Sequence, residues 1–182
     1  PYSFGGHRGY SFSRLISYLV GMDAMLSTPL ATAASFVFLF FLFSSFLAST
    51  GAGQFFIDLA LGLAGGTRGG PAKVAVIGSA LFGMISGSSS ANVVASGTFT
   101  IPMMIKTGYS PRFSAAVESV ASTGGQMTPP ILGAAAFIIA ELTGTPYLDI
   151  ALATVIPALL YFTSIYYMID LEALKLSLMG HK

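Results

Sequence analysis

The sequence predicts an all-α polytopic membrane protein, built from transmembrane helices, a re-entrant helical hairpin and a broken helix. Three observations support this fold class. Of the 182 residues, 54% are hydrophobic and only 8% are charged, whereas about a quarter are charged in an ordinary soluble domain. The charges are confined to short stretches between long uncharged windows. Two of these windows carry polar, Gly-rich or Pro-rich centres, which a plain membrane span does not need.

Composition also excludes several classes of protein. Eight Lys and Arg against seven Asp and Glu give a net charge of +1, so the chain has no basic face for nucleic acid. The absence of cysteine excludes disulfides and thiolate metal sites. The first residue is Pro1 rather than Met, and we expect a piece of a longer protein. A very apolar soluble helical core is the alternative fold.

The four uncharged windows cover residues 24–57, 74–105, 119–140 and 150–169. A helix needs roughly 20 apolar residues to cross the hydrocarbon core of a bilayer. Each window is therefore long enough to reach into a membrane, and short charged loops separate the windows.

The first window predicts a membrane span over 29–47, because residues 36–43 are continuous bulky apolar side chains. The preceding residues, 1–28, are expected to form a loop or linker. The stretch 54–64 is too short to span again before the Gly-rich residues 65–70. It predicts a short helix in the membrane interface.

The second window predicts a re-entrant hairpin over 74–105, with helical arms over 74–85 and 92–105. Its centre is the polar, flexible stretch Ser86–Asn92. Non-helical backbone inside a membrane is tolerated only where protein or a cavity surrounds it. The alternative is a single helix whose small residues pack against neighbours.

The third window predicts a helix over 111–142 that is broken near its middle. Ser110 and Pro111 form a favourable helix start. The stretch Gly124–Pro130 contains two glycines and two prolines, which make helix continuation costly. A simple proline kink is the alternative.

The last window predicts a span over 148–169, followed by a tail over 171–182. If the hairpin returns to its starting face, six basic residues lie on that face and two on the other. The positive-inside rule then places the hairpin mouth and the C-terminal tail in the cytoplasm. The six are Arg68, Lys73, Lys106, Arg112, Lys175 and Lys182, and the two are Arg8 and Arg14.

The hairpin tip and the helix break together predict a binding site, because half-helix N-termini and unwound carbonyls suit anionic substrates and hard cations. The candidate residues for substrate and ion are Ser86, Gly87, Ser88, Ser89, Ser90, Asn92, Gly124, Gly125, Gln126, Thr128, Pro129 and Pro130. The candidate Na⁺ ligands among them are Ser88, Ser89, Asn92, Gly124 and Thr128. Alternatively, Asn92 caps the helix that forms the second arm of the hairpin. The Gln126 amide is expected to touch substrate.

Glu118 is an ionisable residue inside the first half of the broken helix. It could bind a proton, pair with Lys106 or Arg112, or reach the membrane surface. An enzyme is not expected, because both histidines, His7 and His181, lie outside every window. An ion or solute channel is the alternative function. A selectivity filter is a ring that several subunits build around an axis, and the asymmetric pairing of a hairpin with a broken helix does not fit this arrangement.

Several motifs resemble the large membrane subunit of tripartite ATP-independent periplasmic (TRAP) transporters. They are Arg68–Lys73, Gly83–Val94, Gly97–Met104, Gly108-Tyr109 and Ser122–Pro130. The Ser-Ala-Asn-Val-Val and Gly-Gly-Gln-x-x-Pro-Pro forms are similar to the TAXI branch, in which the two membrane subunits are usually fused. The resemblance covers about residues 29–175.

This resemblance implies a permease subunit of a bacterial or archaeal inner membrane that works with a periplasmic substrate-binding protein. It implies import of a small organic acid anion by an elevator mechanism, driven by Na⁺ or, alternatively, H⁺, without an organic cofactor. The stretches Ser86–Asn92 and Gly124–Pro130 would then form half of the site. The remaining inverted half and the small membrane subunit are the further partners it implies.

Overall fold

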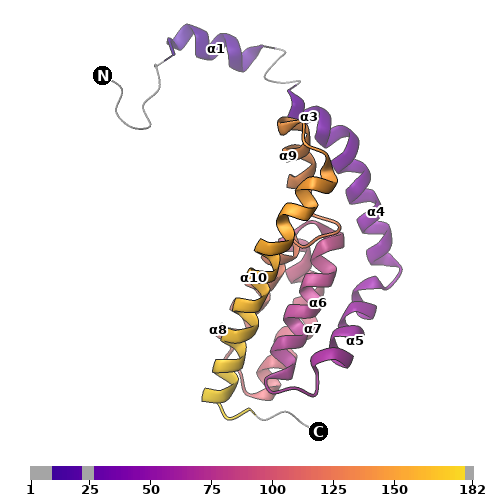
Figure 1. The fold of residues 1–182 in the computed structure, drawn as a ribbon, viewed down its shortest axis with the longest axis vertical. Coiled ribbons are helices and arrows are strands. Elements are labelled where there is room, and N and C mark those ends of the chain that lie inside the picture. Colours follow the sequence, from indigo (N-terminus) through magenta and orange to yellow (C-terminus); the bar gives the residue numbers. More distant parts are fainter. Residues whose placement is uncertain (1–9, 22–26, 179–182) are drawn as a thin grey trace.

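The structure, a computed structural model, describes residues 10–21 and 27–178, and these form helices without any strand (Figure 1). This confirms the all-α prediction. Expectations for residues 1–9, 22–26 and 179–182, including Arg8 and Lys182 of the charge count, lie outside the described residues. The helices are α1 (Phe12–Val20), α3 (Thr28–Thr32), the π-helix η1 (Ala33–Val37), α4 (Phe38–Ser49), α5 (Ala52–Ala64), α6 (Gly70–Ser86), α7 (Ser89–Thr107), α8 (Pro111–Gly125), α9 (Ala135–Thr143) and α10 (Tyr147–Lys175).

Helix α1 corrects the expectation of a loop over the whole of residues 1–28. The Ser11 hydroxyl accepts a hydrogen bond from the Arg14 N–H at 3.4 Å and caps the first turn. No residue of α1 is buried, and the helix stands apart from the bundle (Figure 1). The prediction missed α1 because a helix of this length has no long uncharged run.

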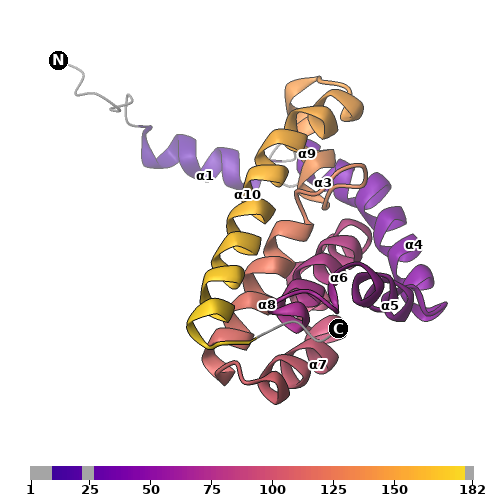
Figure 2. The same cartoon turned by 60° about the horizontal axis from the view of Figure 1, so that its bottom comes forward.

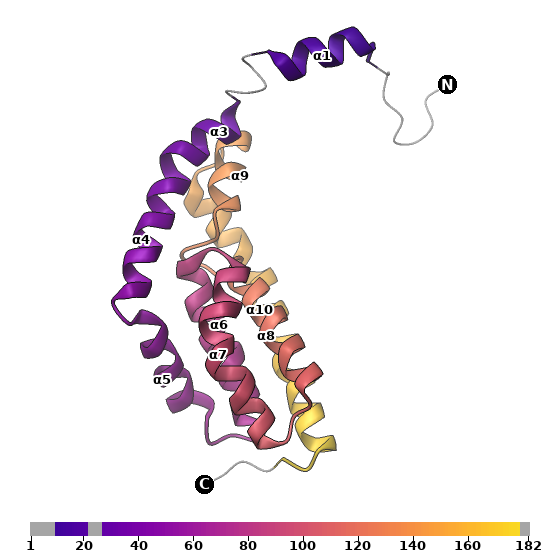
Figure 3. The same cartoon turned by 180° about the vertical axis from the view of Figure 1, so that it is seen from behind.

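The first long helical run passes from Pro29 to Ser49 through α3, η1 and α4. It is long and apolar enough to cross a membrane. Large side chains along it, such as Phe38, Leu42 and Phe46, are exposed. The run lies along one flank of the bundle (Figure 3). An apolar surface of this extent is typical of contact with lipid.

Helix α5 lies against α6 through small side chains. Ala60 and Ala64 of α5 are buried together with Val74 of α6. These alanines let the two backbones approach closely. Helix α5 begins at Ala52, two residues before the expected interfacial helix.

Helices α6 and α7 form the two arms of a hairpin that turns at Gly87 and Ser88 (Figure 3). Both arms are longer than the predicted 74–85 and 92–105. Gly69, in the left-handed region, and Pro71, in the first turn, start α6 at Gly70. At the helical rise per residue the arms are roughly 26 and 29 Å long. A hairpin of this length would reach past the middle of a hydrocarbon core about 30 Å thick.

Helix α8 ends at Gly125 and helix α9 begins at Ala135. The non-helical segment between them, 126–134, extends four residues beyond the predicted break. Pro129 and Pro130 offer no N–H to a helix ladder, and the peptide bond between them is cis. The broken form, rather than a kinked continuous helix, is therefore the one observed.

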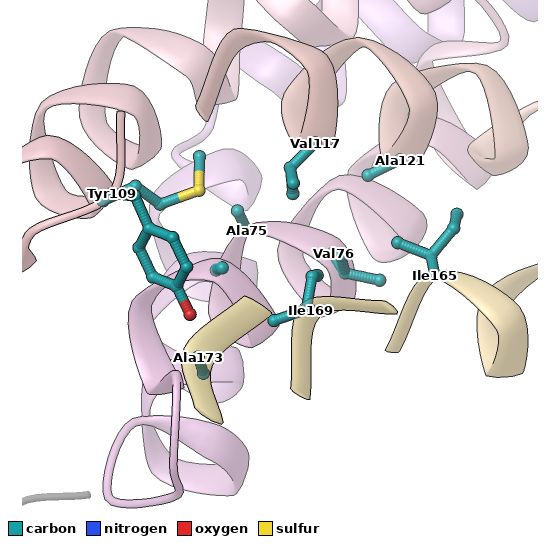
Figure 4. Close-up of a cluster of buried hydrophobic side chains, with 10 residues drawn as sticks. Ala75, Val76, Tyr109, Val117, Ala121, Ile165, Ile169 and Ala173 are labelled. Atoms are coloured by element: carbon teal, nitrogen blue, oxygen red, sulfur yellow. The ribbon is translucent and has the colours of Figure 1, made fainter. Parts of the chain in front are cut away.

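Helix α10 runs from Tyr147 to Lys175 and has 29 residues, which makes it longer than the predicted span over 148–169. It is the second run long and apolar enough to cross a membrane. One face of α10 packs against α6 and α8 (Figure 2). Figure 4 shows the resulting core. It consists of Ala72, Ala75, Val76, Met104, Tyr109, Val117, Ala121, Ile165, Ile169 and Ala173.

One end of the bundle gathers the start of α6, the turn between α7 and α8, and the end of α10. A Cβ atom built on Gly69 would lie 2.6 Å from the Tyr109 hydroxyl oxygen and 2.9 Å from the Ala173 Cβ. The two arms of the hairpin therefore begin and end at the same end of the molecule, which we call the hairpin base.

Candidate functional site

The hairpin tip is a tight turn of two residues. Gly87 has φ +61°, in the left-handed region that favours glycine, and its N–H donates to the Gly83 carbonyl at 3.0 Å. The Ser88 hydroxyl accepts a hydrogen bond from the Ala91 N–H at 3.3 Å and caps α7. The free N-terminal end of α7 therefore lies at the tip.

The segment after α8 folds back on its own backbone. The Gly124 carbonyl accepts from the Met127 N–H at 3.1 Å and from the Thr128 hydroxyl at 3.0 Å. The Gln126 carbonyl accepts from the Gly133 N–H at 2.7 Å. A carbonyl oxygen has two lone pairs, so Gly124 offers no free carbonyl in this conformation. This differs from the expectation that unwinding frees it as an ion ligand.

Glycine backbones bring the tip and the break together. A Cβ atom built on Gly83 would lie only 2.6 Å from the Gly125 Cα. One built on Gly133 would lie 3.2 Å from the Gly87 carbonyl oxygen. The hairpin therefore packs backbone to backbone against the end of α8 and the segment after it.

The predicted hydroxyl ligands of tip and break line different pockets. Ser86 and Ser88 line a pocket of about 410 Å³ beside Ser44 of α4. Thr128 and Pro129 line a smaller pocket of about 190 Å³ beside α10. Ser90 and Pro130 are exposed, and Ser89 and Gln126 are half-buried. In this conformation the structure thus brings the glycines together, while the hydroxyls of Ser88 and Thr128 face separate spaces.

Asn92 is buried and does not cap α7, because Ser88 does. Its side-chain amide donates to the Ser79 carbonyl on α6 at 2.7 Å. Its side-chain oxygen accepts from the Ser96 hydroxyl at 3.1 Å. Asn92 therefore joins the two arms of the hairpin just below the tip, and the reading of this residue as a helix cap is wrong.

Glu118 lies in a buried polar cluster where α6, α7 and α8 meet, and its side chain is fully buried. Four hydroxyl groups contact its carboxyl group. Those of Ser79, Thr100 and Ser122 lie at 2.8, 2.5 and 3.3 Å, and the Ser96 hydroxyl makes a short contact. We call these five residues the Glu118 cage. Glu118 pairs with neither Lys106 nor Arg112 and does not reach the surface, so two of its three expected roles are excluded.

A spacing pattern in the sequence points to this cage. Asn92, Ser96 and Thr100 are spaced four residues apart on α7, and Glu118 and Ser122 have the same spacing on α8. Residues four apart share one helix face. Two such polar stripes on neighbouring helices predict that those faces meet.

An ionic cluster holds the hairpin base to α10. Asp170 forms ion pairs with Arg68 and, at 2.7 Å, with Lys73. Lys73 is only 4% exposed and lies 4.3 Å from the centre of the Tyr166 ring. The hydrogen bond to Asp170 raises the pKa of Arg68. Among the described residues, no three His, Cys, Asp or Glu side chains gather as metal ligands.

Comparison with known sequences identifies the family. The family described as "Tripartite ATP-independent periplasmic transporter, DctM component" matches residues 12–182. No solved structure matches the chain significantly.

Three relatives illustrate the similarity. The C4-dicarboxylate TRAP transporter large permease protein DctM of Pseudomonas aeruginosa is 37% identical over 122 residues, 66% of this chain and 28% of that protein. Its namesake in Vibrio cholerae is 41% identical over 91 residues, 50% of this chain and 20% of that protein. The isethionate TRAP transporter permease protein DctMQ of Oleidesulfovibrio alaskensis is 41% identical over 86 residues, 47% of this chain and 13% of that protein. The chain thus spans less than a third of each relative, and all three are named as permeases, not enzymes.

Proposed function

Because this chain belongs to the DctM component family of tripartite ATP-independent periplasmic transporters, we propose that it forms one part of a membrane permease for small organic acid anions. The permease receives its substrate from a periplasmic binding protein. Relatives named for C4-dicarboxylate and isethionate transport support this substrate class. The structural observation that supports it most directly is the hairpin tip packed against the broken helix.

The N-termini of two helices are placed to bind an anion. Helix α7 begins at the tip, at Ser89, and helix α9 begins just after the break, at Ala135. Helix N-termini carry unpaired N–H groups and partial positive charge. In a permease, the Gln126 amide and these N–H groups bind the carboxylate of the substrate. The inverted second half of the permease supplies the other side of the site.

The hairpin is re-entrant in this proposal, with its base in the cytoplasm. Single cysteines at Thr67 and Lys106, both exposed at the base, are then modified by a cytoplasmic thiol reagent. A cysteine at the exposed Asp149 is modified from the periplasm. The chain has no cysteine of its own, so within it the thiol reagent modifies only the introduced residue. Labelling of Thr67→Cys and Lys106→Cys from opposite faces contradicts the re-entrant course.

The helices α6, α7 and α8 move as one body in the proposed elevator mechanism. The buried contacts of Asn92 and Glu118 with both arms support this unit. The exposed apolar surface of α4 faces lipid at its side. The small membrane subunit, fused to this chain as the two membrane subunits are in the TAXI branch, forms part of the fixed scaffold.

Na⁺ is the proposed coupling ion, held by hydroxyl and carbonyl oxygens of Ser88, Ser89, Gly124 and Thr128. Binding requires the Thr128 hydroxyl to release the Gly124 carbonyl, so the ion and this hydrogen bond compete. Substitution of Thr128 by Val removes the hydroxyl that is one of the proposed ion ligands. The Na⁺ concentration for half-maximal uptake is therefore expected to rise in proteoliposomes that hold the full-length permease and its binding protein.

Thr143→Val is the matched control, since the Thr143 hydroxyl donates to the carbonyl of Ile139 in the same way, at 2.7 Å, but far from the tip. Equal Na⁺ dependence in the Thr128→Val and Thr143→Val variants contradicts the ion site. Uptake by the 182-residue chain alone contradicts the proposed need for the second half and favours a channel.

A further inference from the structure

The Glu118 cage lies one helical turn below the contact between tip and break, and the proposed function leaves it without a role. Glu118, Ser79, Thr100 and Ser122 are fully buried, and Ser96 is 3% exposed. Gly97 makes the space, because a Cβ atom built there would lie 3.2 Å from the Glu118 Cγ. Four hydroxyl groups are thus arranged around one buried carboxyl group, as in a binding site.

The contacts of the cage leave room for a proton on the Glu118 carboxyl group. Each hydroxyl has one hydrogen to donate. The Ser96 hydroxyl can donate it to the Asn92 carbonyl at 2.8 Å, and the Thr100 hydroxyl to the Ser96 carbonyl at 3.0 Å. The Thr100 oxygen can then accept the single proton of a neutral carboxyl group. A proton on Oε2 of Glu118 would donate to the Thr100 oxygen 2.5 Å away.

The surroundings offer no cation to balance an ionised Glu118, as far as the described residues extend. Lys73 on α6 is paired with Asp170 of α10. Lys106 on α7 and Arg112 on α8 are each six residues from their cage neighbour, about 9 Å of helix rise. The other titratable groups on the packed helices are Asp58 on α5, bound to Gln54, and seven on α10 besides Asp170, namely Tyr147, Asp149, Tyr161, Tyr166, Tyr167, Glu172 and Lys175. The four hydroxyl groups can hydrogen-bond an ionised carboxylate but do not neutralise its charge, so Glu118 has no cation to pair with inside the bundle.

A pocket lies beside the cage. It has a volume of about 280 Å³ between α5, α6 and α7, and its lining includes Gln54, Gly78 and Ser96. Ser96 is the residue that both lines this pocket and contacts the Glu118 carboxyl group. A proton from water in the pocket can therefore reach Glu118 through a single hydroxyl.

We propose that Glu118 is a proton-binding site that exchanges its proton with water through Ser96 as the unit of α6, α7 and α8 moves. On loading, the carboxylate takes one proton from a hydronium ion, and water is released. The reverse step returns the proton to water. Because the cage joins α6, α7 and α8, a proton bound there acts on the packing of these three helices as one unit. The proton is thereby coupled to the movement of that unit.

The first test measures protonation directly in the full-length permease, so it does not depend on the proposed transport function. The permease is labelled with ¹³C at the glutamate side-chain carboxyl groups and examined by infrared spectroscopy. We expect the C=O stretching band of a protonated carboxyl group, which shifts to lower frequency in D₂O. The band is expected to vanish in Glu118→Gln and to persist in Glu141→Gln, a control at an exposed residue of α9. A spectrum in which Glu118→Gln removes only an ionised carboxylate band overturns the proposal.

The second test separates a proton from Na⁺. Glu118→Gln has the shape of the neutral acid, so the variant is expected to fold and to keep substrate exchange. Accumulation driven by a pH gradient should fall at least tenfold, while the Na⁺ concentration for half-maximal uptake stays the same. A tenfold rise in that Na⁺ concentration would show that the cage holds Na⁺, and unchanged accumulation driven by the pH gradient would show no proton role. Either result overturns the inference.

Discussion

Gly83 is the position where the packing of the hairpin on the broken helix can be tested most sharply. A Cβ atom there would meet the Gly125 Cα at 2.6 Å and the Asn92 side-chain nitrogen at 2.9 Å. Real Cβ contacts of this kind are longer than 3.0 Å, and the Gly125 atom belongs to the backbone and cannot turn aside. Helices α6 and α8 must therefore move apart in a Gly83→Ala variant.

The size of the effect follows from two opposing contributions. Alanine in place of glycine inside a helix favours folding by about 1 kcal/mol. Overpacking of a tight contact costs about 1–3 kcal/mol, and the upper end applies where backbones collide. Gly78 on the same helix is the control, because its Cβ atom would meet Ile57 at 3.8 Å, an ordinary contact. We expect Gly83→Ala to be less stable than Gly78→Ala by about 2–3 kcal/mol.

Thermal unfolding of the purified full-length permease measures this difference. The Gly83→Ala variant is expected to melt below the wild type, and Gly78→Ala at or above it. Substrate uptake should fall with Gly83→Ala, because the displaced α8 carries the break. If the Gly83→Ala variant melts as high as Gly78→Ala, the close contact between α6 and α8 is not as we describe it.

Three further predictions concern single side chains. Burial, with the charges of Asp170 and Glu172, raises the pKa of Tyr109 from about 10 to about 12, so the folded state holds the phenol proton more tightly. Stability should therefore fall between pH 10 and 12 in the wild type but not in Tyr109→Phe, which melting temperatures measured against pH will show. Gly87→Val should abolish uptake at unchanged expression, because φ is +61° and the added Cβ meets a ring of α4 at 2.4 Å; normal uptake refutes this account of the tip. Asp170→Asn should lower the melting temperature of the permease, since the buried Lys73 then loses its carboxylate partner and keeps the Tyr166 ring. Glu172→Gln, at the exposed pair, should lower it less, and equal melting temperatures would contradict this.

The sequence by itself determined the helical membrane fold and the positions of its interruptions. Long uncharged windows leave few alternatives to helices in lipid, because the backbone must satisfy its own hydrogen bonds there. Gly87 and the pair Pro129-Pro130 interrupt helices for local reasons, namely a left-handed turn and missing N–H groups. Helix ends were less predictable. Caps such as Ser11 and Ser88 decide them, and each cap is a single hydrogen bond.

Only the tertiary structure decided what the polar residues do. Residue type alone makes Asn92 as good a candidate ion ligand as Ser88. In the structure Asn92 joins the two hairpin arms, because its helix face turns toward Ser79. Thr128 is a predicted Na⁺ ligand, and only the structure shows that its hydroxyl is bonded to Gly124 in this conformation. Glu118 could be placed inside the membrane from its neighbours alone. Its four hydroxyl partners come from three consecutive helices, α6, α7 and α8. Which faces of those helices meet depends on how closely the glycines let them pack.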